Sequence, residues 1–298
     1  MSQSESTSTP APARRLRSAL YMPGANERAL VKAHDIPADA LILDLEDAVA
    51  PAAKEDARAR VCAAASSGAY GERTVTIRVN GIATEWHRAD VAAAAHAGPH
   101  AIVVPKVDTV AEVHAVEQLL RDCGAPEHTR IWAMLETPAA ILRAAEIASA
   151  SERLEVLVMG TNDLAAELYA VVDGVERGEP ARGPLLAALS ACVLAARATG
   201  RSILDGVYND VSNPEGFAAE CRQGRAYGFD GKTLIHPSQV EPCNEAFSPS
   251  PAEVEHAQRV IAAFEEAERA GSGVVTVDGR MIENLHVATA RRVLALAG

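Results

Sequence analysis

Aromatic residues are scarce in this chain, because Phe, Trp and Tyr together make up only 4% of its 298 residues. The core must therefore be built mainly from Val, Ile, Leu and Ala, within an apolar fraction of 48%. Such a composition suits helices packed closely around a buried parallel sheet. Long apolar runs are missing too, and nothing in the sequence approaches the roughly 18 residues that a membrane span requires.

Paired cysteine motifs and an excess of basic residues are also lacking. The five cysteines form no CxxC pair, and an odd number of scattered cysteines is typical of reduced thiols in a cytosolic protein. Aspartate and glutamate outnumber lysine and arginine by 40 to 28, which gives a formal net charge of −12. A chain this acidic is a poor candidate for a nucleic-acid binder, because phosphate contacts need a basic surface. A small anionic substrate stays open, because local charge decides its binding.

Short apolar runs alternate with helix-length segments along most of the chain. The runs are near-continuous, as expected for parallel strands that are buried on both faces. There are eight of them: Ser18–Met22, Ala40–Leu45, Thr74–Val79, Ala101–Val107, Ile131–Glu136, Glu155–Gly160, Ser202–Val207 and Lys232–His236. Segments of helical composition lie between them, for example Lys54–Ala65, Ala111–Arg121 and Pro138–Ser149. Eight such units predict an α/β fold, a (β/α)8 TIM barrel over residues 16–248. An open doubly wound sheet remains the alternative.

The two ends of the chain differ from this pattern. Residues 1–15 are rich in Ser, Thr, Pro and Ala and lack the apolar stretch of a secretory signal, so we expect a disordered arm on a cytoplasmic protein without a membrane partner. Residues 249–298 form a C-terminal extension with a helix over Pro251–Ala270, a glycine-rich turn, and a final helix near His286–Leu296. The apolar face of this extension must be buried on the barrel or on a neighbouring subunit, and we favour the neighbour.

Ionisable and amide side chains gather where the predicted strands end. In a barrel, these carboxyl ends form the rim that carries the active site. The rim residues are Asp44, Glu46, Asp47, Arg78, Asn80, Lys106, Glu136, Asn162, Asp163, Asp205 and His236. Any one of them could be a helix N-cap, a turn residue or a side chain that reaches solvent. Helix capping alone does not explain why seven strand ends carry them around one rim.

Glu136 and Asp163 are the best pair of metal ligands in the sequence. They follow successive predicted strands, so their carboxylates can approach one ion from adjacent positions on the rim. Two carboxylates with waters and substrate oxygens are the usual surroundings of Mg²⁺, with Mn²⁺ as a possible substitute. Arg78 would lie nearby as a planar cation for an anionic oxygen. Glu46 and Asp47 are candidates for holding Arg78 and metal-bound waters in place.

These residues belong to segments that carry a family likeness. The chain resembles the citrate lyase β-subunit-like family of the HpcH/HpaI aldolase superfamily, which includes malyl-CoA and citramalyl-CoA lyases. The matching segments follow one another in order over nearly the whole chain: RSALYMPGANERALVKA (17–33), ADALILDLEDAVAP (38–51), VTIRVNG (75–81), VVPKV (103–107), ETPAAI (136–141), GTNDLA (160–165), DGVYNDVSNPEGF (205–217) and GFDGKTLIHPSQVEPCNEAFSP (228–249).

The resemblance implies Mg²⁺ on Glu136 and Asp163, Arg78 at the thioester oxygen, and a homo-oligomer, trimer or hexamer, in which the extension reaches a neighbour. It also implies coenzyme A near the first strand, where Arg17, Arg28 and Lys32 form a local basic group. Arg28 and Lys32 are four residues apart, so they could instead belong to a solvated helix face.

One departure from the family pattern concerns the tail. The family usually reads DGxMIDxP there and offers the Asp to the neighbouring active site as a general acid or base. This chain has Glu283 at that position and Leu285 in place of the Pro. Glutamate keeps the carboxylate but is one methylene longer, and proton transfer depends on placement within hydrogen-bond distance.

We therefore expect a Mg²⁺-dependent carbon–carbon lyase that cleaves or forms a 3-hydroxyacyl-CoA such as malyl-CoA or citramalyl-CoA. The products would be an acyl-CoA and a 2-oxo acid such as glyoxylate or pyruvate. In this mechanism Arg78 stabilises the enolate and Glu283 transfers the proton. The alternatives are a malyl-CoA thioesterase or malate synthase-like enzyme, a citrate lyase β subunit acting on an acyl-carrier-protein thioester, an aldolase of free 2-oxo acids, and a non-catalytic CoA-ester-binding protein.

Overall fold

The computed structural model describes residues 15–172, 175–176, 179–180 and 182–297. The predicted N-terminal arm therefore lies outside the described residues, apart from Arg15. The chain separates into two compact units, Leu16–Phe247 and Ser248–Gly298. No helix in the described part of the chain is long and apolar enough to cross a membrane.

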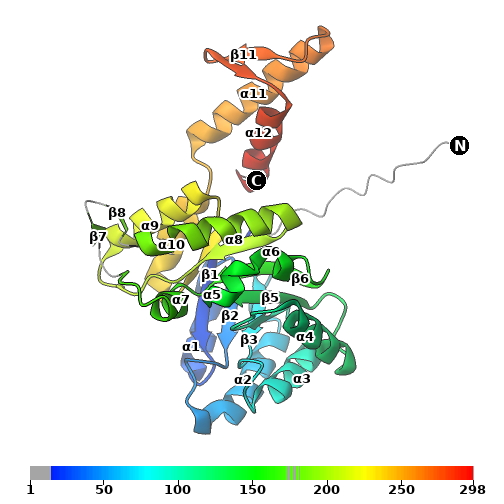
Figure 1. The fold of residues 1–298 in the computed structure, drawn as a ribbon, viewed down its shortest axis with the longest axis vertical. Coiled ribbons are helices and arrows are strands. Elements are labelled where there is room, and N and C mark those ends of the chain that lie inside the picture. Colours follow the sequence, from blue (N-terminus) through cyan, green and yellow to red (C-terminus); the bar gives the residue numbers. More distant parts are fainter. Residues whose placement is uncertain (1–14, 173–174, 177–178, 181, 298) are drawn as a thin grey trace, which may run out of the picture. The chain divides into compact units, whose positions relative to one another are not determined.

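Unit Leu16–Phe247 is a closed parallel barrel (Figure 1) with the strand order β1-β10-β9-β6-β5-β4-β3-β2. Its strands are β1 Ser18–Pro23, β2 Ala40–Asp44, β3 Thr74–Arg78, β4 Ala101–Val104, β5 Arg130–Leu135, β6 Leu154–Met159, β9 Ser202–Asp205 and β10 Gly231–Leu234. The predicted (β/α)8 barrel is confirmed, and the open sheet is excluded by the pairing of β1 with β10. Two short strands, β7 Val175–Glu176 and β8 Glu179–Pro180, form a separate pair.

Helices follow the strands as predicted. They are α1 Glu27–Lys32, α2 Lys54–Ser66, α3 His87–Ala97, α4 Val110–Asp122, α5 Pro138–Leu142, α6 Ala144–Ala148, α7 Thr161–Glu167, α8 Leu186–Thr199, α9 Pro214–Tyr227 and α10 Val240–Phe247. Short 3-10 turns occur at Ala33–Asp35, Pro51–Ala53, Gly183–Leu185 and Pro237–Gln239. One helix prediction was wrong: Pro138–Ser149 forms two short helices, because Arg143 between them has a non-helical backbone (φ −112°, ψ 12°).

Aliphatic side chains fill most of the barrel, as the composition predicts, but its interior also holds one large aromatic residue. Trp132 on β5 is fully buried among small and branched side chains from the other strands. Its indole Nε1 donates a hydrogen bond to Glu155 Oε2 at 3.0 Å, and His100 Nε2 lies 2.7 Å from the same oxygen. The barrel is therefore a packed core and leaves its chemistry to the rim.

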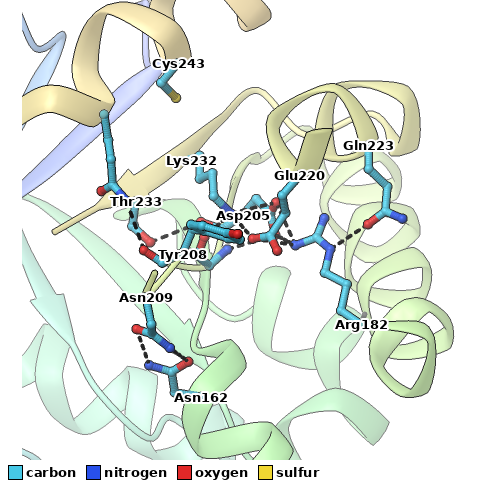
Figure 2. A network of polar contacts seen from close by, with 12 residues as sticks. Asn162, Arg182, Asp205, Tyr208, Asn209, Glu220, Gln223, Lys232, Thr233 and Cys243 are labelled. Carbon is cyan, nitrogen blue, oxygen red and sulfur yellow. Dashed lines mark hydrogen bonds and ion pairs between the residues drawn. The ribbon is translucent and has the colours of Figure 1, made fainter. Parts of the chain in front are cut away.

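A buried polar network joins strands β9 and β10 to helix α9 (Figure 2). Lys232 Nζ lies 3.2 Å from Asp205 Oδ2 and 2.6 Å from Glu220 Oε1. Arg182 Nη1 contacts the same two carboxylates at 2.9 and 3.4 Å. Burial alone would raise the pKa of Asp205, but the charges of Lys232 and Arg182 outweigh it and lower that pKa. Asp205 therefore stays ionised at neutral pH, and the network ties the end of β9 to its neighbours.

Unit Ser248–Gly298 has a small core of its own. Helices α11 Pro251–Arg269 and α12 Asn284–Ala297 pack with a hairpin of β11 Val275–Val277 and β12 Arg280–Ile282. The hairpin turns at Asp278 and Gly279, whose positive φ angles of 50° and 76° suit an Asp-Gly turn. Seven side chains are buried inside the unit: Ala257, Val260, Phe264, Val277, Ile282, Val287 and Ala290. The extension therefore buries part of its apolar surface within itself, which the sequence analysis did not expect.

Replacing Lys232 with Met should lower the free energy of unfolding by about 3–5 kcal/mol, because two buried carboxylates lose one of the two cations that they share and keep only Arg182. The loss should be seen by tryptophan fluorescence in urea, since both tryptophans, Trp86 and Trp132, lie in the barrel unit. Because the pKa of Asp205 is lowered in the folded state, its ionised carboxylate adds to the free energy of unfolding above the unfolded-state pKa. This contribution is lost as pH falls. The difference between variant and wild type should therefore hold above about pH 5 and shrink below about pH 4.

Arg121→Gln is the matched control, because it removes an ion pair to Glu117 on the surface of α4. It should cost no more than about 0.5 kcal/mol. An equal loss in both variants would contradict the importance given to the buried network.

Candidate active site at the carboxyl ends of the strands

A cavity of about 450 Å³ opens at the carboxyl ends of the barrel strands. Its charged and aromatic lining comes from β1, β2, β3, the residues that directly follow β2 and β5, and the first turn of α7: Tyr21, Asp44, Asp47, Arg78, Glu136 and Asp163. Met134, Met159, Val207 and Ile235 add apolar surface. Four of the residues predicted from the sequence to be functional, Asp47, Arg78, Glu136 and Asp163, therefore line one cavity.

Arg78 is held in a fixed orientation at the floor of this cavity. Its Nε and Nη2 donate to the two carboxylate oxygens of Asp44, each at 2.7 Å. Its Nη1 lies 2.7 Å from Glu46 Oε2, and its guanidinium carbon lies 4.7 Å from the centre of the Tyr21 ring. A guanidinium has five N–H donors, so these contacts leave two for a ligand. Arg78 is therefore a preorganised donor.

Asp44 and Tyr21 are parts of the site that the sequence analysis missed. Asp44 was seen only as one of several polar residues at the end of a strand, yet it faces Arg78 directly in the register of β2 and β3. It also accepts hydrogen bonds from the backbone N–H of Glu46 at 2.9 Å and of Ala48 at 3.1 Å. The sequence places both residues next to last in their predicted strands, but it does not give the register that sets them opposite each other.

Glu46 and Asp47 lie in the turn after β2 but have different surroundings. Burial raises the pKa of Glu46 to about 7, and Asp47 adds to the rise, although the charge of Arg78 opposes it. Asp47 is mostly exposed and lies 3.6 Å from Arg78 Nη1. Lys54 holds this turn in place, because its Nζ donates to the carbonyls of Leu45 and Glu46 at 2.8 and 2.7 Å. Glu46 can therefore exchange a proton near neutral pH.

Glu136 and Asp163 lie at neighbouring positions on the cavity wall. Glu136 is buried, and its Oε1 accepts a hydrogen bond from the backbone N–H of Lys106 at 2.7 Å. Burial, and then the charges of Asp163 and Glu46, raise the pKa of Glu136 to about 7. Asp163, in the first turn of α7, lies 3.1 Å from Lys106 Nζ. The pair thus has an excess of negative charge, and a lysine ammonium already lies beside it.

The donor set fits a divalent cation with oxygen ligands. A Cβ atom at Gly160 would lie 2.2 Å from Glu136 Oε2, so the absent side chain makes room for this carboxylate. Among the described residues, no group of three or more His, Cys, Asp or Glu side chains could hold a metal. Two carboxylates therefore leave the remaining positions to water and substrate oxygens, which is the usual way that proteins hold Mg²⁺.

The three basic residues predicted to bind coenzyme A do not form one cluster. Arg17 precedes β1, and its Nε and Nη2 donate to the two carboxylate oxygens of Asp39 at 2.8 and 2.7 Å. It therefore lies at the amino end of the strand, whereas Arg28 and Lys32 are exposed on α1, which follows the carboxyl end. A strand of six residues separates these ends by roughly 20 Å. Arg17 therefore does not form one cluster with Arg28 and Lys32, and the predicted contacts of these residues with coenzyme A stay a prediction.

Glu283 belongs to the C-terminal unit. It is exposed, stands directly before α12, and its backbone N–H donates to His286 Nδ1 at 3.2 Å. Its expected role as a proton carrier for a neighbouring subunit stays a prediction.

Replacing Gly160 with Ala should displace the Glu136 carboxylate, because the new methyl group would overlap its Oε2. If the pair holds a divalent cation, the affinity for Mn²⁺ measured by calorimetry should fall by roughly tenfold or more. Gly183→Ala is the control, because its Cβ would meet open space. Equal Mn²⁺ affinity in wild type and Gly160→Ala would show that the cation does not depend on Glu136.

Comparison with known proteins identifies the family of the chain. The family model described as HpcH/HpaI aldolase/citrate lyase matches residues 17–237. A (3S)-malyl-CoA thioesterase of Cereibacter sphaeroides (strain ATCC 17029 / ATH 2.4.9) is 54% identical over 281 residues, 94% of each chain. A citrate lyase subunit beta of Escherichia coli (strain K12) is 38% identical over 286 residues, which cover 94% of this chain and 93% of that one.

A solved structure is also similar to this chain. Protein CitE from Mycobacterium tuberculosis, in complex with magnesium, acetoacetate and coenzyme A, is 30% identical with a TM-score of 0.78, covering 94% of this chain and 97% of that one. The family match spans most of the barrel and includes Arg78, Glu136 and Asp163. The chain belongs to the HpcH/HpaI aldolase/citrate lyase family.

Proposed function

We propose that this protein hydrolyses the thioester of a 3-hydroxydicarboxylic acyl-CoA of the malyl-CoA class. The observation that carries the proposal is the cavity that the fixed guanidinium of Arg78 lines together with the carboxylate pair Glu136 and Asp163. The 54% identity to a thioesterase of this substrate class favours hydrolysis over the lyase reaction that the sequence analysis placed first.

Glu136 and Asp163 would hold Mg²⁺, or Mn²⁺ in its place. A bound divalent cation would neutralise the two carboxylates and bind the hydroxyl and carboxylate oxygens of the acyl group, which orients the substrate. Gly160 keeps Glu136 in place for this task, and the backbone N–H of Lys106 fixes its other oxygen.

Arg78 would bind the thioester carbonyl oxygen. Negative charge develops on that oxygen when water attacks the carbonyl carbon, and a fixed guanidinium stabilises it without reorganisation. Asp44 and Tyr21 hold the guanidinium, so the cost of ordering it is met during folding. Arginine suits this position better than lysine, because its planar guanidinium engages Asp44 through two nitrogens and Glu46 through the third.

Glu46 is our candidate for the general base. A carboxylate with a pKa of about 7 is half deprotonated at neutral pH and can take a proton from the attacking water. Asp47 is the other acidic residue beside Arg78 and lines the cavity. The exposed Arg28 and Lys32 on α1 would contact the phosphates of coenzyme A.

A carbon–carbon lyase reaction in the same cavity is the second candidate. The 38% identity to a citrate lyase subunit beta favours it. In this reaction Arg78 would stabilise the acyl-CoA enolate that remains when a 2-oxo acid leaves, and Glu283 of a neighbouring copy would protonate its carbon. The lyase proposal therefore includes a homo-oligomer, whereas hydrolysis at Arg78 requires only the barrel.

The test of function follows two products in one assay. Protein with Mg²⁺ and malyl-CoA or citramalyl-CoA should release free thiol without glyoxylate or pyruvate. Glu136→Gln and Asp163→Asn should each lower kcat/KM by about 100-fold or more, because a ligand of the cation is lost. Glu167→Gln removes an exposed carboxylate from the same helix as Asp163 and should have no effect.

The other outcomes of this assay would each contradict hydrolysis. Release of a 2-oxo acid without free thiol would replace hydrolysis by the lyase reaction. Absence of both products from either thioester would contradict both candidates and direct the search to acyl-carrier-protein thioesters or free 2-oxo acids.

The pH dependence tests Glu46. As a base it must be deprotonated, so kcat/KM should rise with pH and level off above a pKa near 7. Glu46→Gln should lower kcat/KM and abolish this limb, whereas Asp47→Asn should retain it. If the limb survives in Glu46→Gln, another group takes the proton.

Glu283 separates the two candidate reactions. For hydrolysis, Glu283→Gln should change thiol release less than about twofold, because no carbon is protonated. For the lyase reaction, the same variant should lose 2-oxo acid release, and Glu283→Asp should restore part of it. A loss of thiol release in Glu283→Gln would show that the C-terminal unit takes part in hydrolysis.

A further inference from the structure

Lys106 has an unusual backbone in the turn after β4. Its φ angle is 50°, in the left-handed region, which among the described residues only two other non-glycine residues share, Tyr169 and Asp278. A lysine has no local reason to adopt this strained conformation, which persists only where the surroundings impose it. Its neighbours Pro105 and Val107 are buried, and Val107 N–H donates to Met134 O at 3.3 Å. The chain therefore bulges at one residue and returns to the sheet.

The bulge connects Lys106 to both members of the acidic pair. Its backbone N–H donates to Glu136 Oε1 at 2.7 Å, and its side-chain Nζ lies 3.1 Å from Asp163 Oδ1. The backbone contact holds one carboxylate, and the ammonium partly neutralises the other. One residue thus donates to the first carboxylate through its backbone and places a positive charge beside the second.

The two contacts differ in how easily they can be broken. The backbone donor is fixed by the buried residues on either side, whereas the Lys106 side chain is 53% exposed and that of Asp163 is 40% exposed. An ion pair this exposed is weak, and the flexible lysine stem can swing into solvent. The ammonium can therefore leave Asp163 without disturbing Glu136.

We propose that Lys106 is a displaceable internal counter-ion of the carboxylate pair. Its ammonium neutralises Asp163 while no divalent cation is bound and gives way when one binds, so the lysine sets the metal affinity of the site. The inference rests on the proposed function, because it takes Glu136 and Asp163 as the metal ligands. It makes Lys106 a positioning residue for Glu136 through its backbone and a competitor of the metal through its side chain.

Four variants separate these roles in a calorimetric titration with Mn²⁺. Lys106→Gly removes the ammonium and suits the left-handed backbone, so the donor to Glu136 is kept. Lys106→Met removes the charge but keeps most of the stem, and Lys106→Arg keeps the charge. Lys32→Met is the matched control, because it removes one positive charge from the exposed face of α1.

Lys106→Gly and Lys106→Met should bind Mn²⁺ about two- to fivefold more tightly than wild type, which corresponds to the loss of one exposed ion pair. Lys106→Arg and Lys32→Met should match wild type. A second readout uses the four lysines of the chain, Lys32, Lys54, Lys106 and Lys232, after ¹³C reductive methylation. Saturation with Mg²⁺ should shift the NMR signal that is missing in Lys106→Arg and leave that of Lys32 in place.

Unchanged or weaker Mn²⁺ binding in both Lys106→Gly and Lys106→Met would overturn the inference, as would a Lys106 signal that Mg²⁺ does not move. A wild type whose Mn²⁺ affinity is unaffected by Glu136→Gln would instead remove the metal site from the proposed function, and the inference with it. The two failures are therefore distinguishable in the same titrations.

Discussion

The ion pair between Asp44 and Arg78 is the interaction on which the candidate site depends. The two residues end neighbouring strands, face each other in register, and form two hydrogen bonds of 2.7 Å. Both are buried, so removal of either would leave an uncompensated charge beside the core. The pair fixes the guanidinium against Tyr21, and the backbone of the following turn is fixed because Asp44 also accepts two of its N–H groups. Closure of the barrel thus determines where the Arg78 guanidinium lies in the cavity.

Negative charge is in excess around the Arg78 guanidinium. Glu46, Glu136 and Asp163 lie near one another at the rim, and the pKa values of Glu46 and Glu136 are raised to about 7. An acidic rim of this kind is costly in an empty protein and favourable when a divalent cation and an anionic thioester are bound together. Arg78 and Lys106 are the cations that the described part of the chain supplies to it, the first buried between carboxylates and the second exposed. Arg78 must therefore stay in place as a donor, whereas the Lys106 ammonium can move away.

Sequence patterns predicted the barrel and most of the rim, because parallel strands bring their carboxyl ends together wherever the helices between them pack. For this reason Glu136 and Asp163, which are 27 positions apart, could be paired before their geometry was known. Register was not predictable in the same way, so the pairing of Asp44 with Arg78 was missed. Arg17 was misplaced because proximity in sequence hid the fact that β1 separates it from α1. The core of the C-terminal unit went unrecognised because its hairpin strands have only three residues each.

The central claim is that water attacks the thioester carbonyl held by Arg78, so the most direct measurement follows the oxygen atom. Malyl-CoA would be incubated with the protein and Mg²⁺ in H₂¹⁸O, and the products would be analysed by mass spectrometry. The account predicts free coenzyme A and malate that carries one ¹⁸O atom in its new carboxylate. Glyoxylate and intact acetyl-CoA as the products would contradict it, because the carbon–carbon bond would then have broken in place of the thioester.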